Sequence, residues 1–289
     1  MSARILSGKE IAKKIREELK DEIADLKSQG ITPGLATILV GEDPASQVYV
    51  GAKTKTCHDL GIFSDQHTLP ADTSEGKLLS LIDELNNNPK IDGILTQLPL
   101  PKQINETKVL DAISPEKDVD GFHPINVGRF FTVKDFEEMV EKKLFLPCTP
   151  HGMIEIIKRS DIQMNGKEAV VLGRSNIVGK PIAMLLLANN ATVTICHSRT
   201  KDLASVCKRA DILIAAIGKP KFVTADMVKE GACVIDVGVN RTEQGLVGDV
   251  DFEKVVDIAG SITPVPGGVG PMTITMLMVN VVKSAKKRI

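Results

Sequence analysis

Short runs with strand character alternate along this chain with longer stretches in which apolar residues have helical spacing. Apolar side chains recur at helical intervals between residues 11 and 26, after the capping-box pair Ser7 and Glu10, which predicts a first helix. Three further runs, at 35–40, 63–69 and 91–95, predict strands separated by helices that start at Asp43 and Asp72. This alternation predicts an α/β domain with a parallel sheet, in which ligands bind beyond the carboxyl ends of the strands.

The second half of the chain repeats this alternation. Thr149 and Pro150 are predicted as the N-cap and first residue of a helix, and four strands are predicted at 169–172, 192–195, 212–217 and 232–237. The proline- and glycine-rich segment 263–271 cannot be a regular helix or strand, and a final helix is predicted over 271–289. At 289 residues the chain exceeds the usual size of one domain, so two α/β domains are expected.

The strand at 169–172 leads into a small-residue turn and then an apolar helix, a layout that presents backbone N–H groups to a phosphate. The turn reads G-x-S-x-x-x-G from Gly173 to Gly179, so it is either a phosphate cradle or an ordinary connection. About 20 residues on, where an NAD-specific fold has a carboxylate, the chain has Cys196-His-Ser-Arg-Thr200. Its hydroxyls and arginine, together with Arg174, favour NADP over NAD.

The predicted helix after Asp43 places Tyr49, Lys53 and Cys57 on one face. Lys53 is either a solvated lysine or a buried one whose pKa is lowered enough for proton transfer. Lys55 lies on another face and is interpreted as a surface charge.

Two further polar groups lie where strands are predicted to end. Gln97 follows the third strand, as either a loop-capping amide or a ligand-facing side chain. Asp118 and Asp120 form a polar turn, and they are turn formers, metal ligands without a third partner, or acceptors for an amino-pyrimidine edge.

Composition excludes several classes of function. The net charge of −1 indicates neither nucleic-acid nor membrane binding. The five cysteines are widely spaced with no zinc pattern, which favours reduced thiols in a cytoplasmic protein and no metal. No signal peptide or membrane-spanning run is visible.

Several motifs together resemble the bifunctional methylenetetrahydrofolate dehydrogenase/cyclohydrolase family. They follow family order over nearly the whole chain: Tyr49-Val-x-x-Lys53-x-Lys55, Thr96-Gln-Leu-Pro-Leu-Pro101, Pro115-Glu-Lys-Asp-Val-Asp-Gly121, Pro147-Cys-Thr-Pro150, Gly173-Arg-Ser-x-x-Val-Gly179-x-Pro181, Cys196-His-Ser198 and Ile262-Thr-Pro-Val-Pro-Gly-Gly-Val-Gly-Pro-Met-Thr273. One departure is the longer, charged segment 130–146, which is expected to form a surface excursion with a short helix.

The resemblance implies a fold and an activity. It implies a folate-binding catalytic domain at 1–147, completed by the helix 271–289, a Rossmann-like NADP-binding domain at 148–270, an active-site cleft between them, and a homodimer. NADP is expected to oxidise 5,10-methylene-tetrahydrofolate to the 5,10-methenyl compound, which water then converts to 10-formyl-tetrahydrofolate.

The resemblance also implies roles for individual residues. Lys53 is expected to transfer protons in the cyclohydrolase step while Gln97 holds it by a hydrogen bond. Tyr49 is expected to orient the folate and Asp120 to bind its pterin. Further substrate-binding candidates are Leu98, Pro99, Pro264, Pro266, Gly267 and Gly268. Arg174, Ser175 and Ser198 are expected to hold the 2′-phosphate of NADP, and the remaining cofactor-binding candidates are Gly173, Ile177, Val178, Gly179, His197, Arg199 and Val239.

Three other functions stay open at this point. One is an NADP dehydrogenase acting on a small carbonyl compound, although the first-domain motifs argue against so small a substrate. Another is a monofunctional member of the same family, against which the presence of both Lys53 and Gln97 argues. The third is a non-enzymatic nucleotide sensor, which would bind NADP without turnover.

Overall fold

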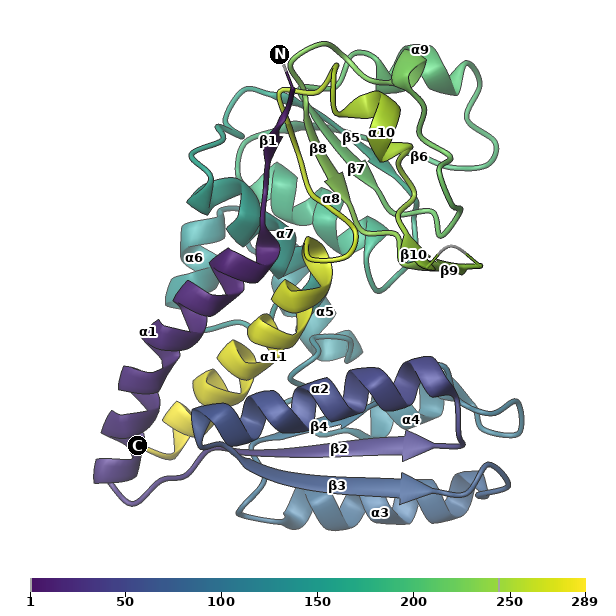
Figure 1. Cartoon of the computed structure of the whole chain (residues 1–289). Helices are drawn as coiled ribbons and strands as arrows, with labels where there is room; N and C mark the ends of the chain where they lie inside the picture. Colours follow the sequence, from purple (N-terminus) through teal and green to yellow (C-terminus); the bar gives the residue numbers. More distant parts are fainter. Residues whose placement is uncertain (1, 244) are drawn as a thin grey trace. The chain divides into compact units, whose positions relative to one another are not determined.

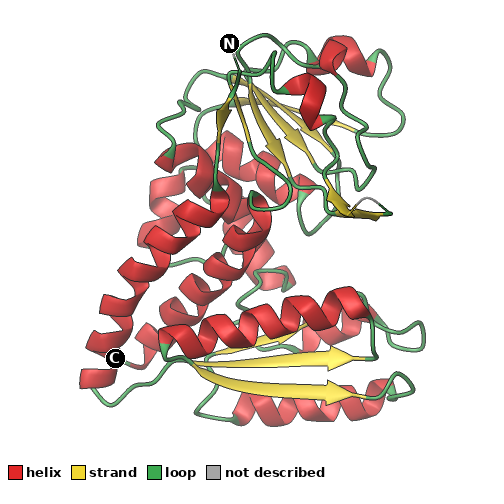
Figure 2. Ribbon diagram, viewed as in Figure 1, coloured by secondary structure: helices red, strands yellow, loops and turns green. Residues whose placement is uncertain are grey.

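The computed structural model describes residues 2–243 and 245–289 and contains two parallel sheets, each in its own compact unit (Figures 1 and 2). Unit 1 comprises Met1–Lys14, Val133–Lys142 and Thr149–Thr273, and unit 2 comprises Ile15–Thr132, Lys143–Cys148 and Ile274–Ile289. This organisation confirms the predicted fold class of two α/β domains.

Unit 2 holds a three-stranded parallel sheet in the order β3-β2-β4. Its strands are β2 (Gly34–Val40), β3 (Phe63–Leu69) and β4 (Gly93–Thr96), and its crossover helices are α2 (Pro44–Leu60) and α3 (Glu75–Asn87), followed by α4 (Glu106–Ala112). The chain leaves β2 toward one edge and then returns past it to β4. Because such crossovers are right-handed, α2 and α3 cover opposite faces of the sheet (Figure 1).

Residues at the helix ends explain where α2 and α3 begin. Asp43 precedes Pro44 and its Oδ2 accepts a hydrogen bond from the Ser46 backbone N–H at 2.7 Å, as predicted for this start. The prediction that Asp72 caps the next helix is wrong. Ser74 is the N-cap, and its Oγ accepts from the Lys77 N–H, because that hydroxyl directly precedes the first helical turn.

Unit 1 holds a six-stranded parallel sheet in the order β1-β11-β8-β7-β5-β6. Its strands are β1 (Arg4–Ile5), β5 (Glu168–Leu172), β6 (Thr192–Cys196), β7 (Ile212–Ala215), β8 (Cys233–Asp236) and β11 (Ser261–Ile262). A separate antiparallel hairpin pairs β9 (Asn240–Thr242) with β10 (Gly245–Val247). The helices of this unit are α6 (Phe136–Glu141), α7 (Cys148–Arg159, from its second residue), α8 (Gly179–Ala188), α9 (Leu203–Cys207) and α10 (Phe252–Val255), with a short 3-10 turn η1 (Ala225–Met227).

Both sheets have a topological switch point. In unit 1 the chain runs from β5 to β6 on one side and then to β7 on the other, so the connections after β5 and β7 diverge. In unit 2 the same divergence occurs between β2 and β4. Open α/β sheets bind ligands at this point, which directs attention to the segments after Leu172 and Thr96.

The remaining helices are α1 (Gly8–Ser28), α5 (Pro124–Thr132) and α11 (Val269–Ala285), followed by a 3-10 turn η2 (Lys286–Arg288). The segment 130–146 contains the expected short helix, α6. It is not wholly at the surface, because Phe130, Phe136 and Met139 are buried whereas Phe131 is exposed. Among the described residues no helix is long and apolar enough to cross a membrane.

Several elements differ from the sequence prediction. Helix α11 begins at Val269, so the prediction that 263–271 contains no regular structure is wrong for its last three residues, because Pro271 is tolerated in the first helical turn. β1 and β11 contain two residues each, which is too short to produce an alternating pattern, and neither was predicted. Helix α7 begins at Cys148, so Thr149 and Pro150 occupy its first turn and Thr149 is not the N-cap. Pro150 is tolerated there because the first-turn N–H groups have no intrahelical acceptor.

Candidate active site

Lys53 lies on α2 with its side chain buried in unit 2. Only 7% of the residue is exposed, and its Nζ donates a hydrogen bond to Gln97 Oε1 at 2.8 Å. Tyr49 lies one helical turn earlier and is partly exposed, and Cys57 lies one turn later and is buried. The shared face that the spacing predicted therefore carries a buried amine flanked by a phenol and a thiol.

Gln97 is held at the carboxyl end of β4 by its backbone N–H, which donates to the Ile38 carbonyl at 2.8 Å. Its Nε2 donates to the Leu98 carbonyl at 2.8 Å, so its Oε1 faces Lys53. A neutral amide accepts a hydrogen bond from either form of the amine but offers no countercharge. Gln97 thus fixes the direction of Lys53 without holding it as an ammonium.

The two carboxylates of the polar turn have different surroundings. Asp118 is buried and accepts hydrogen bonds from the backbone N–H groups of Phe122 and His123 and from Asn126 Nδ2, at 2.8–3.1 Å. It organises the turn. The Asp120 carboxylate is partly buried and interacts electrostatically with Lys53 and with the thiol of Cys148. Of the pair, Asp120 is the carboxylate beside the buried lysine.

Burial shifts the protonation equilibria of this cluster. It lowers the pKa of Lys53, although the charge of Asp120 and the neighbouring Cys148 oppose the effect. It raises the pKa of Asp120 to about 6, against the stabilising charge of Lys53. It also raises the pKa of the Cys148 thiol well above its ordinary value, so this thiol stays protonated and is not a nucleophile. The cluster is suited to proton transfer by an amine.

Three residues next to the cluster were not singled out from the sequence. Cys148 and Asn280 lie behind the Val119–Asp120 peptide, and Lys283 donates to the Leu144 carbonyl at 2.8 Å. Burial lowers the pKa of Lys283 to about 8. The sequence feature that could have identified Asn280 is its position as a single asparagine in the apolar run of α11. Within residues 2–243 and 245–289, no group of three potential ligands could hold a metal ion.

The turn after β5 in unit 1 has the close backbone packing of a phosphate-binding loop. Gly173 has φ 123°, and a Cβ there would clash with the Ala216 carbonyl at the end of the neighbouring β7 segment. A Cβ on Gly179 would clash with the backbone of Gly173. Ser175 Oγ accepts from the N–H groups of Val178 and Gly179 at 3.2 Å, which fixes the entry into α8. The cradle therefore requires both glycines, and it fits a nucleotide phosphate.

The second predicted cofactor segment follows β6. His197 N–H donates to Thr200 Oγ1 at 2.9 Å, and His197 Nδ1 accepts from the Arg199 N–H, which closes a tight turn. Ser198 and Arg199 on this turn are exposed, as are Arg174 and Ser175 on the first. Ile177 and Val239 are 41% and 47% exposed, large values for such apolar residues. Exposed cationic and hydroxyl groups with nearby uncovered apolar side chains fit a phosphorylated dinucleotide.

A fully buried carboxylate, Asp249, organises the segment after β7. It accepts hydrogen bonds from the N–H groups of Ile217, Gly218 and Lys219 at 2.7–2.9 Å, and from Asn240 Nδ2 at 2.9 Å. It thereby ties this segment, on the β7 side of the switch point, to β9. Asp249 was not predicted as a site residue, because one aspartate before a short helix carries no distinctive sequence pattern.

The candidate substrate residues Pro264, Pro266, Gly267 and Gly268 lie in the loop between β11 and α11, within unit 1. The Val265–Pro266 peptide is cis, and Gly267 has φ 102°. The Lys9 N–H donates to the Gly267 carbonyl at 3.0 Å, and a Cβ on Gly8 would clash with the Gly268 carbonyl. Leu98 and Pro99 lie after Gln97 in unit 2 and are also joined by a cis peptide.

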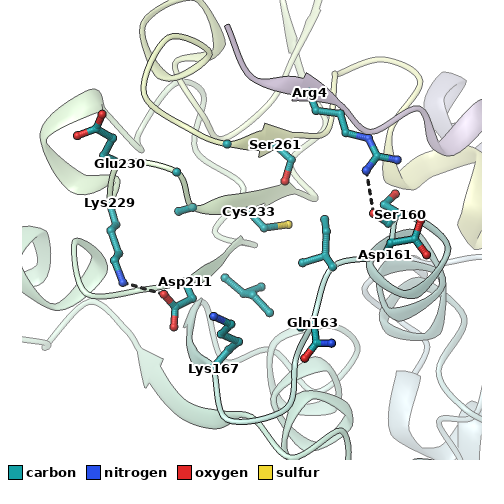
Figure 3. A pocket seen from close by; sticks show the side chains of 15 residues that line it. Arg4, Ser160, Asp161, Gln163, Lys167, Asp211, Lys229, Glu230, Cys233 and Ser261 are labelled. Atoms are coloured by element: carbon teal, nitrogen blue, oxygen red, sulfur yellow. Dashed lines mark hydrogen bonds and ion pairs between the residues drawn. The ribbon is translucent and has the colours of Figure 1, made fainter. Parts of the chain in front are cut away.

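Unit 1 contains a pocket of about 380 Å³ (Figure 3). It lies at the opposite end of the sheet from the switch point. Its lining residues Lys167, Asp211, Ala232 and Gly260 each directly precede a strand, so the pocket lies at the amino ends. Two of its charged side chains, Lys229 and Asp211, form an ion pair at 2.7 Å. It is therefore separate from the predicted cofactor segments.

Two family models match the chain. Residues 6–120 match the catalytic domain of tetrahydrofolate dehydrogenase/cyclohydrolase, and residues 147–289 match its NAD(P)-binding domain. The chain is 60% identical over 288 residues to the bifunctional protein FolD of Moorella thermoacetica, with 99% of this chain and 100% of the relative covered. It is 59% identical to the FolD protein of Geotalea uraniireducens with the same coverage.

Solved structures agree over the full length. The bifunctional FolD enzyme of Campylobacter jejuni superposes with a TM-score of 0.93 at 49% identity, covering 100% of both chains. The FolD enzyme of Trypanosoma brucei, complexed with NADP and an inhibitor, gives a TM-score of 0.93 at 38% identity and covers 100% of this chain and 99% of that one. The chain therefore belongs to the tetrahydrofolate dehydrogenase/cyclohydrolase family.

Proposed function

We propose that this chain is a bifunctional folate enzyme. It oxidises 5,10-methylene-tetrahydrofolate to 5,10-methenyl-tetrahydrofolate with NADP, and then hydrolyses that product to 10-formyl-tetrahydrofolate. The observation that carries the proposal is the buried Lys53 amine, held by Gln97 at 2.8 Å beside the Asp120 carboxylate, in a chain that matches both domains of the family.

The dehydrogenase step needs positioning more than acid–base chemistry, because the two nitrogens of the substrate stabilise the cation that forms. When bound, NADP supplies the hydride acceptor. The cradle of Gly173, Ser175 and Gly179 fits its phosphates, and Arg174, Ser175 and Ser198 would hold the 2′-phosphate. Ile177, Val178, His197, Arg199 and Val239 complete the proposed cofactor contacts.

The cyclohydrolase step needs a proton acceptor and a proton donor. Water adds to the methenyl carbon and gives up a proton, which the neutral Lys53 amine accepts. The bond from that carbon to N5 then breaks as the added hydroxyl becomes the formyl carbonyl and loses its proton to solvent, and Lys53 returns its proton to N5. Conversion of the cation plus water into the formyl product releases one proton overall. Burial favours the neutral amine that the first transfer requires.

The family resemblance implies which residues bind the substrate. Asp120 accepts two parallel hydrogen bonds from the amino-pyrimidine edge of the pterin, and Tyr49 orients the folate. Leu98 and Pro99, which directly follow Gln97, are proposed as further substrate contacts. The loop residues Pro264, Pro266, Gly267 and Gly268 are proposed as further folate contacts, since their close backbone packing suits a flat ligand.

Folate binding is expected to weaken as the pH falls below about 6. Burial raises the pKa of Asp120 to about 6, so protonation below that pH removes one of the two acceptors that the pterin needs. The KM for folate should rise on the acid side and be level above it. In Asp120→Asn, which does not titrate, the KM should be higher throughout and nearly independent of pH over this range. If the KM for folate still rises at low pH in Asp120→Asn, a group other than Asp120 causes the rise.

Discrimination between NADP and NAD is expected to depend on Arg174. Replacing this exposed side chain by Ala should raise the KM for NADP by roughly 10-fold, because a charge-assisted hydrogen bond to the 2′-phosphate is lost. The KM for NAD, which lacks that phosphate, should be unchanged. Arg209→Ala is the matched control, since Arg209 pairs with Glu168 at the amino end of β5. Equal effects on both cofactors would contradict the assignment.

Three broader expectations complete the proposal. The folate-binding catalytic domain is assigned to 1–147 with the helix 271–289, and the NADP-binding domain to 148–270. A cytoplasmic location is also proposed, consistent with five free, buried cysteines.

The chain is further proposed to form a homodimer through the nucleotide domain. Leu187 on α8 and Ile195 on the edge strand β6 support this, because they are exposed apolar residues on packed neighbours.

The hydrolase half of the proposal can be tested separately. Methenyl-tetrahydrofolate is mixed with the protein in the absence of NADP, and loss of the methenyl chromophore is followed against buffer alone. Faster loss with formation of 10-formyl-tetrahydrofolate supports the bifunctional assignment. Loss at the buffer rate would leave a dehydrogenase without its second activity.

A further inference from the structure

Asn280 is a fully buried polar residue in the apolar run of α11. Its Nδ2 donates to two backbone carbonyls of unit 2, at Val119 (2.8 Å) and Leu146 (3.0 Å), and lies 3.7 Å from Cys148 Sγ. Its Oδ1 has no hydrogen-bond partner among the described residues. A buried unpaired acceptor is costly, so the two bonds made by Nδ2 are what this side chain contributes here.

The Val119 carbonyl belongs to the same peptide unit as the backbone nitrogen of Asp120. That carbonyl also accepts from the Cys148 thiol at 3.3 Å, so two buried donors hold one peptide plane. On the other side of Asp120, the Gly121 N–H donates to the Asp118 carbonyl, and the Asp118 carboxylate holds the next two N–H groups. Asp120 therefore lies between two fixed peptide segments.

Neighbouring packing leaves this segment little room to move. The Leu146 carbonyl, the second acceptor of Asn280, directly precedes Pro147 and Cys148. A Cβ on Gly121 would lie 3.0 Å from the backbone of that segment. Asn280 thus ties the peptide before Asp120 to the segment that carries Cys148.

We propose that Asn280 is a positioning residue that, through the Val119 carbonyl, directs the Asp120 carboxylate toward Lys53 and the pterin. This inference rests on the proposed folate function. Helix α11 would thus contribute to substrate binding and proton transfer, although Asn280 itself would touch neither the folate nor Lys53.

The test compares Asn280→Leu with Ser284→Ala. Ser284 lies one turn later on α11, and its hydroxyl donates to the Glu116 carbonyl at 3.0 Å. It therefore also links α11 to the polar turn, but at a residue four positions before Asp120. Asn280→Leu should raise the KM for folate by roughly 10-fold, the scale expected when a group bound to a charged acceptor is displaced. Ser284→Ala should leave the KM unchanged.

The pH profile of the cyclohydrolase step supplies a second readout. The groups that face Lys53 are Asp120 and Cys148. Asp118 also faces Asp120, and Lys283 faces Cys148 from α11. The Asp120 charge raises the pKa of Lys53, so displacing that carboxylate should lower it. The acid limb of the profile should therefore move to lower pH in Asn280→Leu and stay in place in Ser284→Ala.

A double-mutant cycle separates positioning from general destabilisation. In an Asp120→Ala background, Asn280→Leu should cause no further change in folate KM or pH profile, because the group it positions is gone. Effects that multiply, or a wild-type KM and pH profile in Asn280→Leu, would overturn the inference. If Asn280→Leu does not fold, Asn280→Ser takes its place with the same readouts and the same criteria. A wild-type protein without folate turnover would instead refute the proposed function.

Discussion

Replacing Lys53 by Met is expected to lower the cyclohydrolase rate by about 10²- to 10⁴-fold, the range for loss of a group that transfers protons. Lys53 is the buried amine of unit 2 that Gln97 holds at 2.8 Å, and burial favours its neutral form. Met has similar length and no charge, so the fold should be retained. The rate is measured as loss of the methenyl chromophore without NADP. The dehydrogenase step should be affected far less, because it needs no proton transfer.

Lys55→Met is the matched control for this change. Lys55 lies two residues away on the same helix, is exposed, and pairs with Asp59 at 2.7 Å. Its replacement should leave both activities close to wild type, since exposed ion pairs contribute little. Wild-type hydrolysis by Lys53→Met, or an equal loss in both variants, would show that Lys53 does not transfer the protons.

Replacing Asp120 by Ala is expected to lower kcat/KM for folate by about 10²-fold or more in both reactions. Two hydrogen bonds to a charged acceptor are lost, at about 1.5–3 kcal/mol each before compensation by water. Most of the change should appear as a higher KM, because the pterin contact exists in the ground state as well as in the transition state. Steady-state kinetics with methylene- and methenyl-tetrahydrofolate measure both effects.

A neighbouring carboxylate serves as the comparison for Asp120. Asp111 is exposed at the end of α4, and Asp111→Ala should leave the KM for folate unchanged. An unchanged KM in Asp120→Ala would refute the role of this carboxylate in binding the pterin. A large fall in kcat without a change in KM would assign Asp120 to the chemical step.

The parts of the fold that the sequence predicted well are those with strong local signals. The spacing of apolar residues in α1, the Asp43-Pro44 start of α2 and the run Ala169–Leu172 each reflect a local requirement of helix or strand. β1 and β11 escaped prediction because pairing across the sheet, and not a local pattern, makes them strands. The start of α3 was misplaced at Asp72 because Asp and Ser are both good N-cap residues, and residue type alone does not identify Ser74 as the true N-cap.

In the candidate site, too, local spacing predicted some features, whereas others depend on contacts between residues distant in sequence. The helical spacing of Tyr49, Lys53 and Cys57 placed them on one face. Spacing could not pair Lys53 with Gln97, 44 positions further along; the resemblance implied that hydrogen bond, and the structure contains it. Spacing alone left Asp118 and Asp120 equivalent, and only the resemblance singled out Asp120. The three donors around Asp118 distinguish the two side chains in the structure. Asn280 and Asp249 form hydrogen bonds with backbone groups distant in sequence, so no local motif could predict them.

The most direct measurement mixes the protein with NADP and 5,10-methylene-tetrahydrofolate and follows NADPH and the methenyl chromophore together. We expect NADPH to rise with little accumulation of the methenyl compound, because Lys53 supports its hydrolysis on the same chain. In Lys53→Met, NADPH and the methenyl compound should rise together. If both already rise together in the wild type, or if no NADPH forms, the bifunctional assignment is contradicted.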